Sequence, residues 1–252
     1  MQSVVSVANM RESDAYTIAH EVPSLTLMGR AAYGIYQVVD WGNEKRIGIV
    51  VGSGNNGGDG SALAWILSQK GISSAIYTLS EKLSPDHAYY LGKARELGVP
   101  IFSFAQHGEE LADCGILVDC ILGTGFQGGV RGLARQAIEA INQSSAFVVS
   151  ADINSGLHGD TGEAELAVHS DLTVSIGSFK TGMFWGSAPD HIRRLVNVDI
   201  GIRMLRQEYR LCPAGQEAGE GEIPCPAYCQ PESLKVQDFG KIGSENGIFS
   251  IE

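Results

Sequence analysis

An aliphatic run that leads into a glycine-rich polar block constrains this chain most. Residues 47 to 51 are β-favouring, and five glycines stand with Asn55, Asn56 and Asp59 in the stretch that ends at Gly60. Residues 61 to 70 then carry apolar side chains at the spacing of one helix face: Ala62, Leu63, Ile66 and Leu67. The pattern predicts a strand, a tight turn and a helix.

Gly52, Gly54 and Gly57 fit the pattern G-x-G-x-x-G, in which missing side chains let backbone amides approach a pyrophosphate. The pattern alone is not specific, and Asn and Asp in such a block also serve as helix caps. A common dehydrogenase needs an acidic residue where its second strand ends. The second strand expected here spans residues 74–79 and is followed by Ser80, which is not acidic. No Gly-Lys-Ser/Thr follows the glycines, which excludes a P-loop.

Length and charge limit the classes of protein further. The 252 residues suffice for one large α/β domain with an appendage. A net charge of −11 argues against a nucleic-acid partner and against an anionic membrane surface, so backbone amides have to hold any anionic ligand. No signal peptide or membrane span is visible, and we expect a cytoplasmic protein.

Five cysteines are present. Cys114 and Cys120 lie in or beside an apolar strand, and we expect them to be buried as small hydrophobic residues. Cys212, Cys225 and Cys229 fall near the C-terminus without an obvious fourth ligand. Free thiols are therefore favoured there over a zinc site.

The remaining periodicity predicts alternating strands and helices. Residues 24–41 form an expected helix that covers the sheet, in preference to a lid or a dimer surface. Beyond Gly201, prolines and glycines interrupt any period, which predicts a domain at 1–202 and a poorly structured or peripheral extension at 203–252. The other elements are expected at 74–79, 86–97, 100–104, 116–119, 132–142, 147–152, 172–176 and, as a closing strand, 195–200.

Carboxylates follow the buried strands where they end. Asp119 and Asp152 each close an aliphatic run, and a second glycine-rich loop at 123–129 follows Asp119. Because parallel sheets bind ligands beyond the carboxyl ends of their strands, we expect Asp59 to gather with these two carboxylates. Lys180 is expected nearby, with a solvated surface lysine as the alternative interpretation.

The loop after Asp152 holds two further polar residues of interest. We expect Ser155 to turn its hydroxyl toward Asp119. His158 is interpreted as an exposed loop residue and not as a base, because the carboxylates occupy the strand ends.

Several of these segments together resemble the YjeF N-terminal domain family, over about residues 4 to 202. The resemblance implies a three-layer α/β/α Rossmann-like sandwich with a mostly parallel sheet. The segments that carry it are 7–10, 54–60, 118–119 with 123–125, 152–157 with 160–162, 171–174, and 179–180 with Gly182.

The activity that the resemblance implies is NAD(P)H-hydrate epimerase, which interconverts the R and S epimers of hydrated NADH and NADPH. It further implies a repair role beside a separate dehydratase that acts on the S epimer, a homodimer, and one potassium ion per subunit. Two alternatives stay open: a nicotinamide-dependent oxidoreductase, and a non-catalytic nucleotide-binding or scaffold protein on the same fold.

Site residues also follow from the resemblance. It implies potassium ligation by Asn56, Asp119 and Ser155, whose amide, carboxylate and hydroxyl oxygens suit a hard cation. The substrate-binding residues that it implies are Asn55, Asn56, Gly57, Gly58, Asp59, Gly123, Thr124, Gly125, Phe126, Gln127, Gly128, Gly129 and Asp152.

Epimerisation at C6 of the hydrated ring needs an acid or base and an anion beside the developing positive charge. Asp152 is the candidate for this chemistry, and to protonate a leaving hydroxyl it has to carry a proton, which burial favours. Lys180 is the second catalytic candidate, as a proton donor or as an orienting charge. Asn154 stands where the family usually has proline, from which we expect a looser turn before Ser155.

Overall fold

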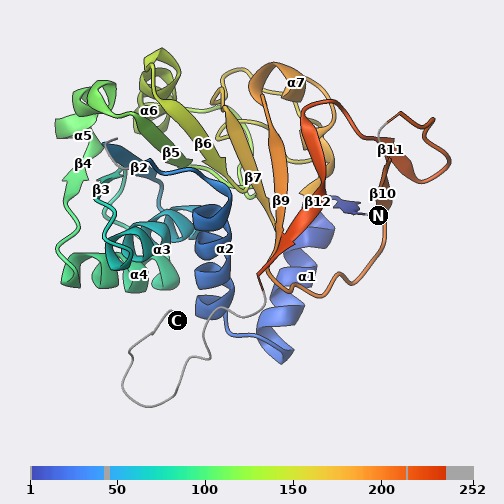
Figure 1. Cartoon of the computed structure of the whole chain (residues 1–252), viewed down its shortest axis with the longest axis horizontal. Helices are drawn as coiled ribbons and strands as arrows, with labels where there is room; N and C mark the ends of the chain where they lie inside the picture. Colours follow the sequence, from blue (N-terminus) through green and yellow to red (C-terminus); the bar gives the residue numbers. More distant parts are fainter. Residues whose placement is uncertain (1, 43–45, 214, 237–252) are drawn as a thin grey trace.

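The computed structural model describes residues 2–42, 46–213 and 215–236. Its centre is an eight-stranded sheet in the order β12-β9-β7-β6-β5-β2-β3-β4, and all strand pairings described within it are parallel (Figure 1). The strands are β2 (Ile47–Val51), β3 (Ser74–Thr78), β4 (Ile101–Ser103), β5 (Ile116–Cys120), β6 (Phe147–Ala151), β7 (Leu172–Ile176), β9 (Leu195–Asp199) and β12 (Cys229–Lys235).

Helices cover both faces of this sheet. The three helices α2 (Ser24–Val38), α3 (Asn55–Gln69) and α4 (Pro85–Glu96) lie on one side and share an apolar core with the strands (Figure 1). A second apolar core packs α5 (Phe104–His107) and α6 (Gly132–Gln143) on the other face. The three-layer fold is confirmed, as is the prediction that residues 24–41 cover the sheet.

A smaller four-stranded sheet in the order β11-β10-β1-β8 flanks this sandwich. Its apolar core is separate from the other two and includes residues of the short helix α7 (Ala188–His191). The helix α1 (Val7–His20) follows its first strand directly. The four strands are β1 (Ser3–Val5), β8 (Phe179–Lys180), β10 (Tyr209–Cys212) and β11 (Glu222–Pro224).

The order of the strands defines where a ligand can enter. From β2 the chain moves outward through β3 to β4, and it then returns to β5 on the other side of β2. The connections that leave β2 and β5 therefore diverge at the carboxyl ends of these two strands. In open parallel sheets this switch in direction creates the crevice that binds ligands.

The expectation of a poorly structured or peripheral extension is wrong for its described part. Strand β10 pairs antiparallel with β1, and β12 extends the main sheet beside β9. Residues 195–200 are therefore not the closing strand. Pro231 lies within β12, and an edge strand accommodates a proline because one side of it needs no ladder hydrogen bond. Residues 237–252 lie outside the described residues, and the domain boundary at 202 stays a prediction.

All five cysteines are free. Cys114 and Cys120 are buried, as predicted, at 4% and 0% exposure. Cys225 lies close to Cys229, and its thiol donates to the Cys229 carbonyl at 3.7 Å. Across the described ranges, no helix has the length and apolar character that crossing a membrane requires.

Candidate functional site

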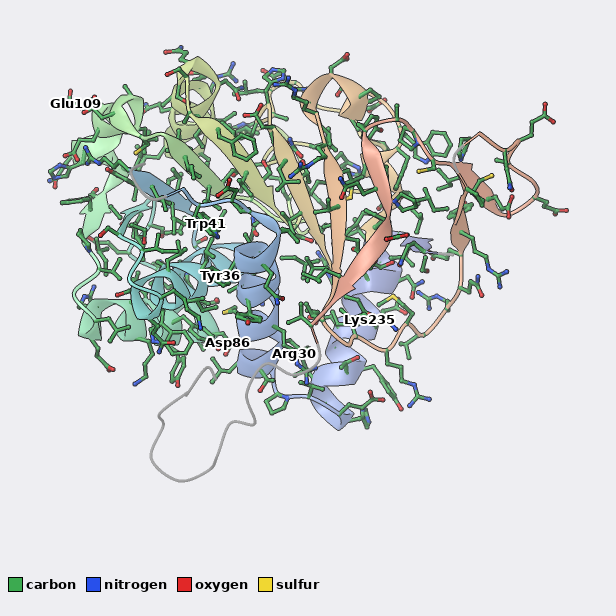
Figure 2. All side chains as sticks on the ribbon, in the orientation of Figure 1. Arg30, Tyr36, Trp41, Asp86, Glu109 and Lys235 are labelled. Carbon is green, nitrogen blue, oxygen red and sulfur yellow. The ribbon has the colours of Figure 1, made fainter. Side chains whose placement is uncertain are left out.

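A cavity of about 510 Å³ lies at the point where the connections from β2 and β5 diverge. Helices α1 and α2, the start of α3, the loop after β5 and the ends of β6 and β8 contribute to its walls. Asp86, at the start of α4, also lines it, and Figure 2 shows Asp86 near the lower end of α2. Nine predicted site residues line the cavity: Asn55, Asn56, Asp59, Gly123, Thr124, Gly125, Phe126, Asp152 and Lys180.

The polar block after β2 is helical and not a loop. Gly54 is the N-cap of α3, so that Asn55 and Asn56 lie in the first turn and Asp59 one turn later. This placement corrects the prediction of a tight turn up to Gly60. The free amides of the first turn and the positive end of the helix dipole face the cavity side, an arrangement that attracts anions.

Gly57 and Gly58, which were predicted to contact substrate, instead let α3 pack closely on its surroundings. A Cβ at Gly57 would lie 2.3 Å from the carbonyl oxygen of Gly52. A Cβ at Gly58 would lie 2.7 Å from the sulfur of Met28. Neither residue lines the cavity.

Asp119 lies beneath the cavity and is fully buried. Its Oδ2 accepts hydrogen bonds from the hydroxyl of Ser150 and the amide of Ser155, both at 2.9 Å. Its Oδ1 accepts from the hydroxyl of Ser155 at 2.5 Å, the contact that the sequence predicted. Burial raises the pKa of Asp119, although the hydrogen bonds from Ser155 and Ser150 oppose the rise.

Asp152 lies in the cavity wall and is held there by hydrogen bonds to both of its carboxyl oxygens. Its backbone has φ of 65°, a left-handed conformation that non-glycine residues rarely adopt. Its Oδ1 accepts from the ammonium of Lys180 at 2.5 Å, and its Oδ2 accepts from the amide of Thr124 at 3.1 Å. Both oxygens are thus occupied as acceptors, which fixes the orientation of the carboxyl group in the cavity wall.

Lys180 is buried, so the interpretation of a solvated surface lysine is wrong. Its side chain is 1% exposed, and besides Asp152 its ammonium donates to the carbonyl of Ile176 at 2.8 Å. A buried ammonium is costly unless it is paired, and here the carboxylate of Asp152 supplies the pairing.

Asp59 lines the cavity together with Asp152, as predicted, whereas Asp119, the third carboxylate of that prediction, does not line it. Burial raises the pKa of Asp59 well above its usual value, and the negative charges of Asp152 and Asp14 add to this rise. Lys180 opposes it. Asp59 therefore holds a proton more readily than an ordinary surface carboxyl.

The second glycine-rich loop divides at Phe126. Gly123 to Phe126 line the cavity. Gly128 and Gly129 line a separate cavity that also contacts Phe126, and Gln127 lines neither. Only the first half of the loop is thus placed to contact a ligand beside Asp152.

Two loop residues after Asp152 differ from expectation. His158 is half-buried, lines the second cavity, and accepts the amide hydrogen of Thr161 at 3.2 Å through Nδ1. Asn154 does not loosen the turn before Ser155, because its buried amide nitrogen donates to Val168 and His191 carbonyls at 2.9 and 3.0 Å. The side chain thus replaces the rigidity of a proline with hydrogen bonds.

The three residues implied as potassium ligands fit a hard cation in part. Asn56 is 8% exposed, and within the described residues both atoms of its side-chain amide lack a hydrogen-bond partner. A buried amide without a partner is costly, so we expect a bound ligand that accepts a hydrogen bond from its nitrogen or a cation that its oxygen coordinates. Asp119 and Ser155 add a carboxylate and a hydroxyl, although they already hydrogen-bond to each other.

Sequence reasoning missed the contribution of α1. Met10, Arg11, Asp14 and Ile18 line the cavity. Met10, Asp14 and Ile18 recur at intervals of four residues, the spacing of one helix face, and Asp14 is the single charged residue among these three. That spacing was visible in the sequence, whereas the docking of this face beside Asp152 was not.

The arrangement defines the chain as an α/β protein with a nucleotide-binding type of crevice, in which a carboxylate and a lysine meet between two glycine-rich segments. Residues 24–182 match the family model described as the YjeF-related protein N-terminus. The chain therefore belongs to this family.

Relatives and solved structures agree with this assignment. The chain is 32% identical over 204 residues to a Limosilactobacillus fermentum protein named NAD(P)H-hydrate epimerase. The matched region covers 79% of this chain and 97% of the relative. It is 39% identical to the bifunctional NAD(P)H-hydrate repair enzyme Nnr of Methanothermobacter thermautotrophicus, over 72% of this chain and 37% of the relative. The crystal structure of the yeast protein ynu0 has a TM-score of 0.66 at 20% identity, covers 86% of this chain and 98% of its own, and shows the shared fold.

Proposed function

We propose that the chain is an isomerase, an NAD(P)H-hydrate epimerase that interconverts the R and S epimers of hydrated NADH and NADPH in nucleotide repair. The observation that carries the proposal is the ion pair of Asp152 with Lys180 inside the cavity, in a chain matched over 97% of the length of a relative named for this activity. The reaction transfers no hydride, so it needs no second substrate that is oxidised or reduced.

Asp152 and Lys180 are the catalytic residues in this proposal. Loss of the C6 hydroxyl leaves a delocalised cation on the ring, and the Asp152 carboxylate stabilises this charge in a partly desolvated cavity. Lys180 and the amide of Thr124 fix the orientation of that carboxylate. Preorganised charge of this kind costs no reorganisation when the cation forms.

The rest of the substrate is proposed to lie along the two glycine-rich segments. The first turn of α3, at Asn55 and Asn56, offers free amides to the phosphates. The loop from Gly123 to Phe126 lines the cavity beside Asp152 and offers further backbone contact. Asp59 completes this set of substrate contacts.

A potassium ion is proposed at Asn56, Asp119 and Ser155. The proposal is supported by the buried side-chain amide of Asn56, which has no hydrogen-bond partner among the residues that the structure describes. When bound, the ion would supply positive charge for the substrate phosphates or hydroxyls. Exchange rates measured in K⁺, in Na⁺ and in a tetramethylammonium buffer test it. Equal exchange rates in all three buffers would refute the proposed potassium site.

The partners are proposed from the relatives. Proteins named bifunctional repair enzymes extend well beyond the region matched here, and this supports a separate dehydratase that consumes the S epimer. We also propose that the chain forms a homodimer and acts in the cytoplasm. Sedimentation of the purified protein tests the first statement, and fractionation of cells tests the second.

Epimer exchange, followed by chromatography of separated R and S hydrates, tests the function. We expect the wild type to bring either pure epimer to the same mixture, with no absorbance change from hydride transfer. Asp152→Asn should lower kcat about 100-fold or more because it removes the stabilising charge. Asp113→Asn, a change of the same kind at a side chain that is 76% exposed, is the control. A wild type that binds dinucleotide without exchange would instead indicate a scaffold protein.

A further inference from the structure

The proposed reaction needs a proton as well as a negative charge. The departing C6 hydroxyl has to leave as water, and the incoming water has to lose a proton on the other face of the ring. Asp152 accepts hydrogen bonds on both oxygens from Lys180 and Thr124, as a carboxylate does. A different group therefore has to carry the proton to the leaving oxygen.

Asp14 is placed for this task by helix α1. Its side chain is half-buried and lines the same cavity as Asp152 and Lys180. Among the described residues, none forms a hydrogen bond or an ion pair with the Asp14 carboxyl. The carboxyl is therefore available to a bound substrate.

The orientation of α1 is fixed from its other side. Buried Ser13 and Thr17 accept the backbone amides of Leu205 and Arg203, both at 3.0 Å. Asn9 donates to the carbonyl of Arg206 at 2.9 Å. These contacts hold one face of α1 against residues 203–206, so that the adjacent face, with Asp14, stays directed at the cavity.

The charges around Asp14 favour its protonated form. Burial raises the pKa of Asp14, and the negative charge of Asp152 raises it further, whereas Lys180 lowers it. Asp59 on α3 is electrostatically coupled to Asp14, and Arg11 and Asp86 also line the cavity. A carboxyl with a raised pKa keeps its proton at higher pH than an ordinary aspartate does, and this suits a general acid.

A second observation shows that the cavity is built for a polar ligand. Asn56 is more than nine-tenths buried, lines this cavity, and within the described residues leaves both amide atoms without a partner. Such a side chain is retained where a ligand satisfies it. Asp14 and Asn56 thus belong to the walls of one polar site.

We propose that Asp14 is a further catalytic residue, the general acid that protonates the departing C6 hydroxyl. This proposal rests on the proposed function. The C6–O bond breaks with its electron pair on oxygen, the oxygen takes the Asp14 proton and leaves as water, and the ring nitrogen shares the positive charge. Water then forms the new C6–O bond on the other face and gives a proton to Asp152, after which exchange with solvent restores both carboxyl groups.

The test compares Asp14→Asn with Glu12→Gln in the full chain. Both changes neutralise one carboxyl on α1, but Glu12 is exposed and ion-paired with Arg206 at 2.7 Å. Epimer exchange is measured from about pH 5 to 9, together with melting temperature. We expect Asp14→Asn to lower kcat roughly 100-fold with little change in KM, and to abolish the alkaline decrease in kcat. Glu12→Gln should behave as the wild type.

Three results would overturn the proposal: an unchanged kcat, a rise in KM alone, or an alkaline decrease that persists in Asp14→Asn. If Asp14→Asn fails to fold, Asp14→Glu decides the question, because it keeps a carboxyl and must keep the alkaline decrease. A wild type without any epimer exchange would instead refute the proposed function. Exchange by the wild type with full activity in Asp14→Asn would refute only the role of Asp14.

Discussion

The two glycine-rich segments of this chain look alike in sequence and serve different ends. After β2, Gly52 and Gly57 lie where backbones approach closely, and a Cβ at Gly52 would stand 1.9 Å from the carbonyl oxygen of Ile121. After β5, a Cβ at Gly125 would lie 3.6 Å from the guanidinium of Arg11, and a Cβ at Gly128 would have no atom of the described residues within 4 Å. Gly52 and Gly57 of the first segment thus permit close packing, whereas Gly125 of the second leaves its backbone open to the cavity.

The largest effect should come from Gly52→Ala. The added Cβ meets backbone rather than a flexible side chain, so the carboxyl ends of β2 and β5 have to separate. We expect a loss of roughly 3 kcal/mol or more in the free energy of unfolding, or failure to fold. Urea denaturation measures it.

Gly54→Ala is the control for that change, two residues away in the same segment. No atom of the described residues lies within 4 Å of its added Cβ, and its φ of −88° suits any residue. Its cost should stay at about 1 kcal/mol, the scale of a poorer N-cap. Equal losses at both positions would show that close packing does not explain the glycines of the first segment.

The second largest effect should come from acid, which lowers the free energy of unfolding through His87 beside the first segment. His87 is fully buried against Gly57, and burial lowers its pKa to about 4, with the Ser53 carbonyl partly opposing this. The folded-state pKa lies below the unfolded value of 6.5, so the contribution is fully present above pH 6.5 and is lost as the pH falls toward 4. The shift corresponds to about 3 kcal/mol at most.

Unfolding measured between pH 7.5 and 4 in wild type and in His87→Gln checks this contribution. The variant carries no titrating ring, and its stability should depend less steeply on pH over this range. If the two curves run parallel, His87 is not the group that makes the first segment sensitive to acid.

Sequence reasoning predicted most strands to within a residue or two, because strands buried on both faces read as uninterrupted aliphatic runs. It placed the start of α3 too late, since Asn and Gly are poor helix formers and residues 55–60 are helical where they pack against the sheet, α2 and α4. It also missed β12, whose Pro231 argues locally against a strand. In both places long-range contacts overrode local preference.

The site was predictable where a strand end carries the residue. Asp119 and Asp152 followed from the ends of their strands, and the contact of Ser155 with Asp119 was predicted as well. Asp14 was not found, because its place at the cavity depends on contacts of α1 with residues 203–206, nearly 190 positions away along the chain. No local pattern encodes that docking.

Gly123→Ala should have a smaller effect on stability and a distinct effect on activity. Its Cβ would lie 3.0 Å from Oδ2 of Asp152 and 3.2 Å from Cβ of Asn56, so these side chains have to shift by a few tenths of an ångström. We expect about 1 kcal/mol or less in unfolding, but roughly tenfold in kcat, because small displacements of a catalytic group are costly. A variant with full kcat would show that the Asp152 position tolerates displacement.

The smallest effect on folding should come from Gly125→Ala. This variant tests most directly whether the second glycine-rich segment serves substrate binding and not packing. The added methyl meets only the end of a long exposed side chain, Arg11, so stability should stay within about 0.5 kcal/mol of wild type. The same methyl projects from backbone that lines the cavity, where a bound substrate has to approach. We therefore expect KM to rise several-fold at unchanged melting temperature, as measured by exchange kinetics and thermal denaturation. An unchanged KM would mean that substrate does not contact this loop, and the second segment would then need another reason for its glycines.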